Sequence, residues 1–307
     1  MSTRSFAAEP PADRPEWLRR RERGSAWLYR LIAGLALALG RAPARCLLPP
    51  IAAYFLVFSG ASRRASMAYL GRALGRPAGL AQVFRHYRSF AAVILDRVFL
   101  LKGRTDLFDI RVSGEEMLTR MVAEGSGCIL LGAHLGSFEV MRAVGRRHGD
   151  RRVRMVMFES NARKIGLVLR GLDPRLAADI IALGQPDSFV EIERALETGE
   201  FVGLLADRAL TDKRQVAVPF LGSDALFPTD PFRMLAILKQ PVVLMAGLYR
   251  GGNRYEVHFE RFAAAEAMPR RPDAEALRAC VAAYAARLDH YCRLAPYNWF
   301  NFYDFWR

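Results

Sequence analysis

The chain of 307 residues is 52% hydrophobic, which excludes an intrinsically disordered protein and allows one large domain or one domain with an appendage. Its net charge of +14 is uneven. Residues 1–100 hold 16 Arg and 5 acidic residues (+11), whereas residues 101–307 hold 29 basic and 26 acidic residues (+3). The basic part also contains the most apolar segments, and this combination favours an anionic membrane surface as partner over a nucleic acid.

The amino-terminal part predicts a membrane anchor. Residues 1–15 are polar and Pro-rich, so we expect a disordered lead, and no signal peptide is apparent. Residues 16–61 contain two apolar runs: one of about ten residues after Arg30 and one at 46–61, which Pro49 and Pro50 interrupt. Since a bilayer span needs about 20 apolar residues, we predict interfacial or re-entrant helices. A true span and a pair of buried helices of a soluble domain are the alternatives.

Residues 62–307 are predicted to form the second domain. Apolar spacings of three and four over 62–102 predict two amphipathic helices. Beyond them, short apolar runs alternate with amphipathic stretches, which predicts an α/β fold with a mostly parallel mixed sheet flanked by helices. Strands are expected at 127–133, 153–158, 178–183, 201–206, 216–220, 241–249 and 254–260. Helices are expected at 115–124, 137–148, 161–171, 187–198, 229–239 and 273–293.

The segment GCILLGAHLGSFE (127–139) is the main candidate for chemistry. An apolar strand ends at a turn that holds His134 between Gly132 and Gly136, and Glu139 follows five positions later. In one continuous helix these two side chains would point about 140° apart. They can meet if His134 lies in the turn and Glu139 in the first turn of the next helix, as expected at the strand ends of an α/β sheet.

An imidazole oriented by a carboxylate is a general base for a hydroxyl. The sequence has no Gly-x-Ser-x-Gly motif, and Cys128 stands at the wrong end of its strand, so no covalent nucleophile is apparent. The simplest chemistry is direct attack of a substrate hydroxyl on an activated acyl group. The spacing alone is a weak signal, because a histidine that only caps a strand would have the same pattern.

Further blocks downstream strengthen this interpretation. They are HLGSFE (134–139), ESNARK (159–164), GEFVGLLADRAL (199–210), VPFLG (218–222), FPTDPFRMLA (227–236) and PVVLMAGLYRGGNRYEVHFE (241–260). Over residues 60–262 the chain resembles the late lipid A acyltransferases of bacterial inner membranes, a branch of the glycerolipid acyltransferase superfamily. The resemblance implies a membrane-associated enzyme that moves a fatty acyl group from acyl carrier protein to a hydroxyl.

By that resemblance, His134 and Glu139 match the catalytic pair of a His-x4-Glu motif, and Asp207 matches the acid of a Leu-Leu-x-Asp block. Thr229 matches a Pro-Thr turn, although Asp230 follows it where glycine is expected. The second block lacks the family's Tyr-Arg-Pro turn. The side chains of Arg163 or Lys164 are candidates for the missing cation that would bind a phosphate or pantetheine group.

Several roles remain open from the residues alone. Asp207 and Arg208 follow an apolar strand, so they are expected at the same sheet edge as His134, either paired with each other or orienting the acceptor. The stretch 219–222 and Phe227 either line an acyl groove or belong to the core. The aromatic residues of 297–306 either pack on the core or act as an interfacial anchor.

The leading hypothesis is an acyltransferase at the cytoplasmic face of the bacterial inner membrane. The donor is an acyl carrier protein or coenzyme A thioester, and the acceptor is a lipid hydroxyl, as in a lipid A precursor or another amphipathic glycolipid or polyene lipid. No metal or redox cofactor is expected, since no His, Cys or acidic residues have ligand spacing. The alternatives are a non-catalytic lipid-binding membrane protein and a thioesterase or esterase that uses the same pair.

Overall fold

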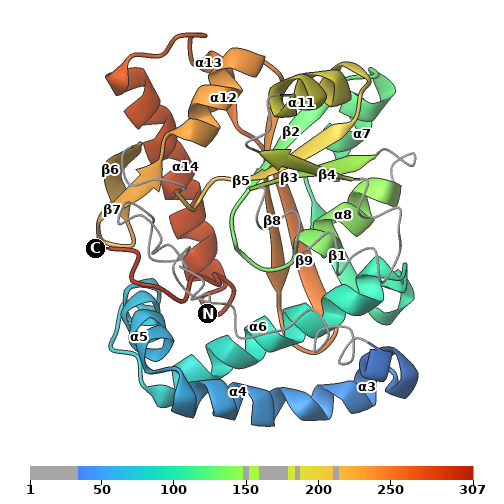
Figure 1. Cartoon of the computed structure of the whole chain (residues 1–307), viewed down its shortest axis with the longest axis vertical. Helices are drawn as coiled ribbons and strands as arrows, with labels where there is room; N and C mark the ends of the chain where they lie inside the picture. Colours follow the sequence, from blue (N-terminus) through green and yellow to red (C-terminus); the bar gives the residue numbers. More distant parts are fainter. Residues whose placement is uncertain (1–33, 148–151, 159–178, 184–186, 210–213, 307) are drawn as a thin grey trace, which may run out of the picture.

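The structure, a computed structural model, describes residues 34–147, 152–158, 179–183, 187–209 and 214–306. At its centre is a seven-stranded sheet of order β1-β9-β8-β2-β5-β3-β4 (Figure 1). Strands β8, β2, β5, β3 and β4 are parallel to one another, β9 is antiparallel to β8, and β1 is parallel to β9. The seven strands are β1 (Asp109–Ser113), β2 (Cys128–Gly132), β3 (Val153–Phe158), β4 (Ile180–Leu183), β5 (Phe201–Leu205), β8 (Val242–Tyr249) and β9 (Arg254–Arg261). The expected α/β fold with a mostly parallel mixed sheet is confirmed.

Helices cover both faces of this sheet (Figure 1). Strand β2 is buried along its whole length, and successive side chains point to opposite faces. Ile129 and Leu131 pack in one apolar core together with Val281 of α14, whereas Leu130 packs in a second core with Val140 of α8. The covering helices are α7 (Glu115–Ala123), α8 (Phe138–Arg147), α11 (Ser188–Glu197), α12 (Asp230–Leu238), α13 (Ala263–Ala267) and α14 (Ala274–Leu294). Burial on both faces explains why β2 is a continuous apolar run rather than an alternating one.

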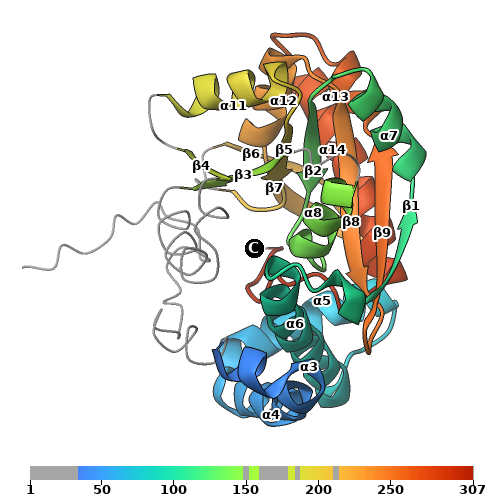
Figure 2. The same cartoon turned by 90° about the vertical axis from the view of Figure 1, so that its right-hand side faces the viewer.

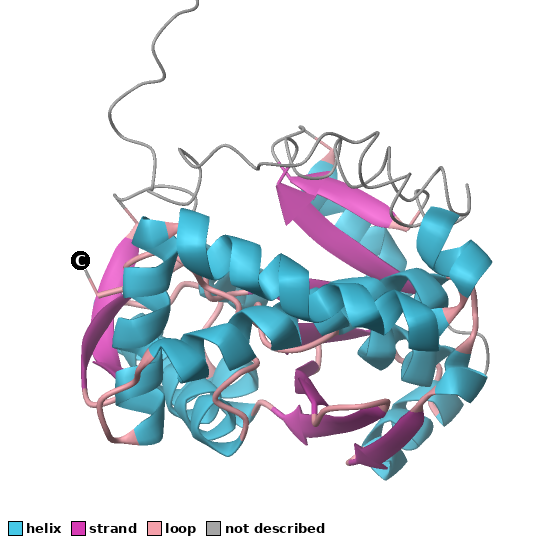
Figure 3. Ribbon diagram, turned by 90° about the horizontal axis from the view of Figure 1, so that it is seen from below, coloured by secondary structure: helices cyan, strands magenta, loops and turns pink. Residues whose placement is uncertain are grey.

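A separate layer of helices lies across one end of the sheet (Figures 1 and 2), and Figure 3 views this layer from outside. It consists of α3 (Arg41–Ala44), the 3-10 helix η1 (Arg45–Leu47), α4 (Leu48–Phe58), α5 (Gly60–Leu74) and α6 (Leu80–Leu101). The two amphipathic helices expected over 62–102 correspond to α5 and α6. In the part of the chain that the structure describes, no single helix has the length and apolar character of a membrane span. Segments Arg41–Phe58 and Gly60–Leu74 meet those criteria only as a pair, bent by 102°.

A buried carboxylate joins this helical layer to the sheet. Asp96 of α6 has no solvent exposure and accepts hydrogen bonds from Arg41 Nε (2.8 Å), Arg41 Nη2 (2.9 Å) and the Tyr255 hydroxyl (2.8 Å). Arg45 Nη2 also donates to the Tyr249 hydroxyl at 3.1 Å. Burial raises the pKa of Asp96, although the charge and hydrogen bonds of Arg41 oppose this effect. The Asp96 carboxylate therefore connects α3, α6 and β9, and the separate bond of Arg45 connects η1 to β8.

Among the described residues, two strands and one α-helix were not expected from the sequence. Strand β1 is a short edge strand with alternating exposure, and its polar sequence DIRVS gives no apolar run from which a strand could be predicted. The segment expected as a strand at 216–220 is β6 (Gln215–Phe220), which pairs with the unexpected β7 (Ser223–Pro228) in a separate two-stranded sheet. Helix α13 is also new. The helix expected at 161–171, the lead expected at 1–15 and residues 16–33 of the predicted anchor lie outside the described residues.

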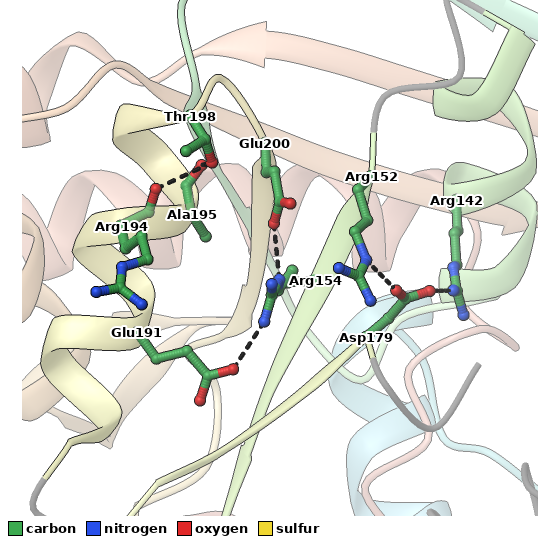
Figure 4. Close-up of polar contacts among 9 residues, drawn as sticks. All are labelled: Arg142, Arg152, Arg154, Asp179, Glu191, Arg194, Ala195, Thr198 and Glu200. Atoms are coloured by element: carbon green, nitrogen blue, oxygen red, sulfur yellow. Dashed lines mark hydrogen bonds and ion pairs between the residues drawn. The ribbon is translucent and has the colours of Figure 1, made fainter. Parts of the chain in front are cut away.

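Charged side chains at the amino-terminal ends of three parallel strands pair with one another (Figure 4). Asp179, before β4, forms ion pairs with Arg142 of α8 and with Arg152 Nε at 2.7 Å. Arg154 of β3 binds both Glu200 and Glu191, each at 2.7 Å. These contacts connect α8, β3, β4 and α11 at the edge opposite to the turn that holds His134, and we assign them a structural role.

His86 of α6 is completely buried, and its side chain contacts α5 and the carboxyl-terminal segment. Its Nε2 donates to the Trp299 carbonyl at 2.9 Å, and its Nδ1 accepts from the Ser66 hydroxyl at 2.8 Å. Burial lowers the pKa of His86 to about 4, although the bond to the Trp299 carbonyl opposes this shift. The ring is therefore neutral in the folded protein at neutral pH.

We predict that this ring makes folding sensitive to mild acid. The unfolded chain binds a proton on His86 below its ordinary pKa of 6.5, but the folded chain binds it only near pH 4. The free energy of unfolding should fall by about 3 kcal/mol as the pH drops from 6.5 to 4. Urea denaturation across this pH range should show a flatter slope for His86→Phe than for the wild type. The variant of the exposed residue His290, His290→Gln, should keep the wild-type slope.

Candidate active site

The site begins where two neighbouring parallel strands end. In the register of β2 and β5, Gly132 lies opposite Leu205, so the residues two positions further along, His134 and Asp207, also come opposite each other. The Ala206 amide donates to the Gly132 carbonyl at 3.0 Å and continues this pairing past the end of β5. The sheet itself thus brings together two residues that are 73 positions apart in the sequence.

A close approach of two backbones fixes the turn after His134. Gly136 has a φ of +66°, which favours glycine, and a Cβ atom there would collide with the carbonyl group of Gly247 in β8. The Ser137 amide donates to the same Gly247 carbonyl at 2.8 Å. The glycine that follows His134 in the motif therefore allows the turn to pack directly on β8, and α8 begins at Phe138.

The partner of His134 differs from the one expected. Its Nδ1 bonds to Asp207 Oδ1 at 2.8 Å, and its backbone amide donates to Asp207 Oδ2 at 3.1 Å. Glu139 does lie in the first turn of α8, but it forms an ion pair with Nη2 of Arg97 in α6, with 2.5 Å between Arg97 Nη2 and Glu139 Oε1. The contact expected between Glu139 and the imidazole is therefore replaced by one from Asp207, because the sheet register favours the neighbouring strand over the next helix.

Electrostatics keep this pair in the state that a base requires. Burial alone would raise the pKa of Asp207, but the charge and hydrogen bonds of His134 and the charge of Arg208 outweigh it and hold that pKa well below the usual value. The protein packed around the ring, together with the charge of Arg208, lowers the pKa of His134, and Asp207 only partly opposes this. At neutral pH the carboxylate is therefore ionised and the imidazole neutral.

One side of the imidazole remains accessible. The His134 side chain is 31% exposed, whereas that of Asp207 is 0% exposed. Because the ionised Asp207 can only accept, Nδ1 carries the proton and Nε2 carries the lone pair. Among the described residues, Nε2 has no hydrogen-bond partner. The lone pair is thus on the ring nitrogen that does not bind Asp207.

The carboxyl-terminal segment completes the site, which the sequence did not indicate. The Trp299 indole Nε1 and the Asn301 amide Nδ2 both donate to Asp207 Oδ2, at 3.0 and 2.9 Å. The backbone of this segment also follows the His134 turn, since the Phe300 amide donates to the His134 carbonyl at 2.8 Å. The aromatic tail was expected either to pack on the core or to act as an anchor, and Trp299 and Phe305 are buried in the core.

The other predicted site residues are spread more widely. Arg208 does lie beside the site, where its Nε donates to Asn301 Oδ1 at 2.7 Å and its Nη2 to the Phe300 carbonyl at 3.1 Å. Thr229 is buried, and its hydroxyl donates to the Arg214 carbonyl at 3.3 Å. Arg163 and Lys164 lie outside the described residues.

In the possible acyl groove at 219–222 and Phe227, three residues belong instead to the core, whereas Pro219 and Gly222 are exposed. Phe220, Leu221 and Phe227 are each at most 2% exposed. The Phe220 ring packs edge-on against Phe227 at 5.3 Å and against Trp299 at 5.2 Å between centroids. Phe220 thereby supports the Trp299 ring, and the buried rings of Phe220 and Phe227 expose too little surface to bind an acyl chain.

A partly exposed imidazole held by a buried carboxylate, at the strand ends of an α/β sheet, has the geometry of an acid–base enzyme site. Comparison with known protein families gives a match over residues 15–307 to the bacterial lipid A biosynthesis acyltransferases. The chain belongs to this family, as its sequence motifs suggested, and it is accordingly a lipid acyltransferase that uses an acyl donor and a lipid acceptor. No individual curated protein matches the chain.

Proposed function

We propose that the protein transfers a fatty acyl group from an acyl thioester to a hydroxyl of a lipid A precursor or a related amphipathic lipid. The donor is acyl carrier protein or coenzyme A, of which acyl carrier protein is favoured by the resemblance to the family. The observation that carries this proposal is the hydrogen bond between His134 Nδ1 and Asp207, which leaves Nε2 available as a base.

In the proposed reaction, His134 Nε2 takes the proton from the acceptor hydroxyl. The hydroxyl oxygen attacks the thioester carbonyl carbon at the same time. Asp207 stabilises the imidazolium that forms. The tetrahedral intermediate then breaks the carbon–sulfur bond, and His134 returns its proton to the leaving thiolate. The products are an ester and a free thiol, so no external oxidant or reductant is needed.

The positive charge of Arg208 lies near the imidazole and can offset the negative charge that develops on the carbonyl oxygen. The backbone amides of Gly136 and Ser137 already donate to the carbonyls of Asn298 and Gly247. Arg208 is close enough to influence the pKa of both His134 and Asp207. We therefore assign the electrostatic stabilisation to Arg208, rather than to these two amides of the turn. We assign Glu139 a structural role, in which its ion pair holds the Arg97 side chain in position.

We also propose that the reaction takes place at the cytoplasmic face of the inner membrane, with residues 16–61 as anchor of the domain 62–307. Large apolar side chains of the described part of this anchor are exposed: Leu35, Leu39, Leu47, Tyr54, Phe55, Val57 and Phe58. The charge of +11 over residues 1–100 suits anionic headgroups. Exposed apolar surface beside arginines is typical of an interfacial segment.

The experiment uses the full chain in detergent with an acyl carrier protein thioester labelled in its acyl group. Label should move into lipid when a total lipid extract from Gram-negative membranes is added, and His134→Ala should abolish this transfer. Acyl coenzyme A is tested in parallel to identify the donor. Equal release of free fatty acid with and without lipid would instead identify a thioesterase. Lipid binding without any turnover would identify a non-catalytic lipid-binding protein.

A further inference from the structure

The carboxylate of Asp207 is held by residues that come from the far end of the chain. Its Oδ1 faces His134 Nδ1, whereas its Oδ2 accepts from Trp299 Nε1, Asn301 Nδ2 and the His134 amide. Trp299 and Asn301 are at most 1% exposed. Water therefore has no access to these two donors, and each would lose a hydrogen bond if Asp207 turned away.

Both donors are themselves fixed in orientation. The Asn301 oxygen accepts from Arg208 Nε at 2.7 Å, so its amide nitrogen must point toward Asp207. The Trp299 carbonyl accepts from His86 Nε2 at 2.9 Å, and the Trp299 ring packs against Tyr69 with 5.0 Å between centroids. The donors on Oδ2 are thus part of a rigid surrounding shell rather than mobile side chains.

We propose that Trp299 and Asn301 are positioning residues of the acyltransferase, which hold the Asp207 carboxylate in the orientation that fixes Nδ1 of His134. This inference rests on the proposed function of His134 as the base. The side-chain hydrogen bonds that Trp299 and Asn301 donate go to Asp207 and not to the imidazole, so we assign both an action through Asp207. A hydrogen bond to a charged group contributes about 1.5–3 kcal/mol, which corresponds to about a 10- to 150-fold change in rate if it is lost in catalysis.

The test compares Trp299→Phe with Trp306→Phe. The first variant removes the indole N–H that donates to Asp207. The second removes the indole N–H of another tryptophan of the carboxyl-terminal segment, which donates to the Phe220 carbonyl at 3.4 Å. We expect Trp299→Phe to lower kcat at least about tenfold with little change in KM for the thioester. Because a carboxylate with fewer donors attracts the imidazolium more strongly, the acidic limb of its kcat–pH profile should move to higher pH. Trp306→Phe should leave that limb in place.

A second variant and a second measurement keep the inference independent of folding and of turnover. Asn301→Ala removes the other side-chain donor without removing a core ring and should move the acidic limb in the same direction. Histidine-labelled NMR should show a higher pKa for His134 in both variants, whether or not the protein transfers acyl groups. Unchanged pKa and kcat in both variants would overturn the inference. An equal loss of kcat in both tryptophan variants, without any shift in the pH profile, would assign Trp299 to packing alone.

Discussion

Asp207→Asn is expected to lower acyl transfer about 10³-fold or more while leaving the protein folded. Asparagine has the shape of aspartate, but its amide would donate to His134 Nδ1, so the ring proton would move to Nε2 and the lone pair would be lost from the side that meets substrate. Nor could an amide stabilise the imidazolium. The measurement is kcat with a saturating acyl thioester, and thermal unfolding verifies that the variant remains folded.

Glu139→Gln is the matched control. In this structure Glu139 bonds to Arg97, whose side chain is 29% exposed, so loss of that ion pair should reduce acyl transfer by less than about tenfold. Asp207→Asn and Glu139→Gln each convert one carboxylate into an amide of the same shape, so they differ only in the position of that change. If Glu139→Gln were as inactive as Asp207→Asn, or Asp207→Asn retained the wild-type rate, the assignment of Asp207 as the partner of His134 would be refuted.

The second large effect is expected on stability. Asp96→Ala removes the carboxylate that pairs with Arg41 and accepts from the Tyr255 hydroxyl, both in a buried cluster. Breaking one side of such a pair leaves an uncompensated charge, and the free energy of unfolding should fall by about 3–5 kcal/mol. Urea denaturation followed by tryptophan fluorescence measures this loss.

The exposed ion pair between Arg104 and Asp106 gives a suitable comparison. Both side chains are more than half exposed, so Asp106→Ala should leave the urea midpoint unchanged within error. A midpoint for Asp96→Ala equal to that of Asp106→Ala would show that the cluster around Asp96 does not join the helical layer to the sheet.

The fold could be predicted well wherever burial dominates. Strand β2 and its neighbours are continuous apolar runs because helices cover both faces, and such runs are recognisable in the sequence. Strand β1 was not predicted because it is a short edge strand with polar residues. Strand β7 was not predicted because only two residues separate it from β6. Both owe their existence to backbone pairing with another segment, which periodicity along the chain does not report.

For the site, the sequence identified the position of His134 but not its environment. A histidine between glycines after an apolar strand indicates a strand-end turn, and the nearest acid in the sequence was Glu139. The neighbour of β2 in the sheet is β5, however, and only that pairing brings Asp207 to the ring. Asp207 was expected at this edge, yet sequence could not show which strands are adjacent. Trp299 lies 92 positions beyond Asp207, and its one local signal was an aromatic tail.

Because Asp207 accepts hydrogen bonds from Trp299 and Asn301, its surroundings are completed only late in synthesis. During synthesis the apolar helices leave the ribosome first, followed by the strands that end at His134 and Asp207. The buried carboxylate receives its indole and amide donors only after Asn301 has emerged. A nascent chain that has not yet reached Asn301 therefore lacks the two side-chain donors that hold the Asp207 carboxylate.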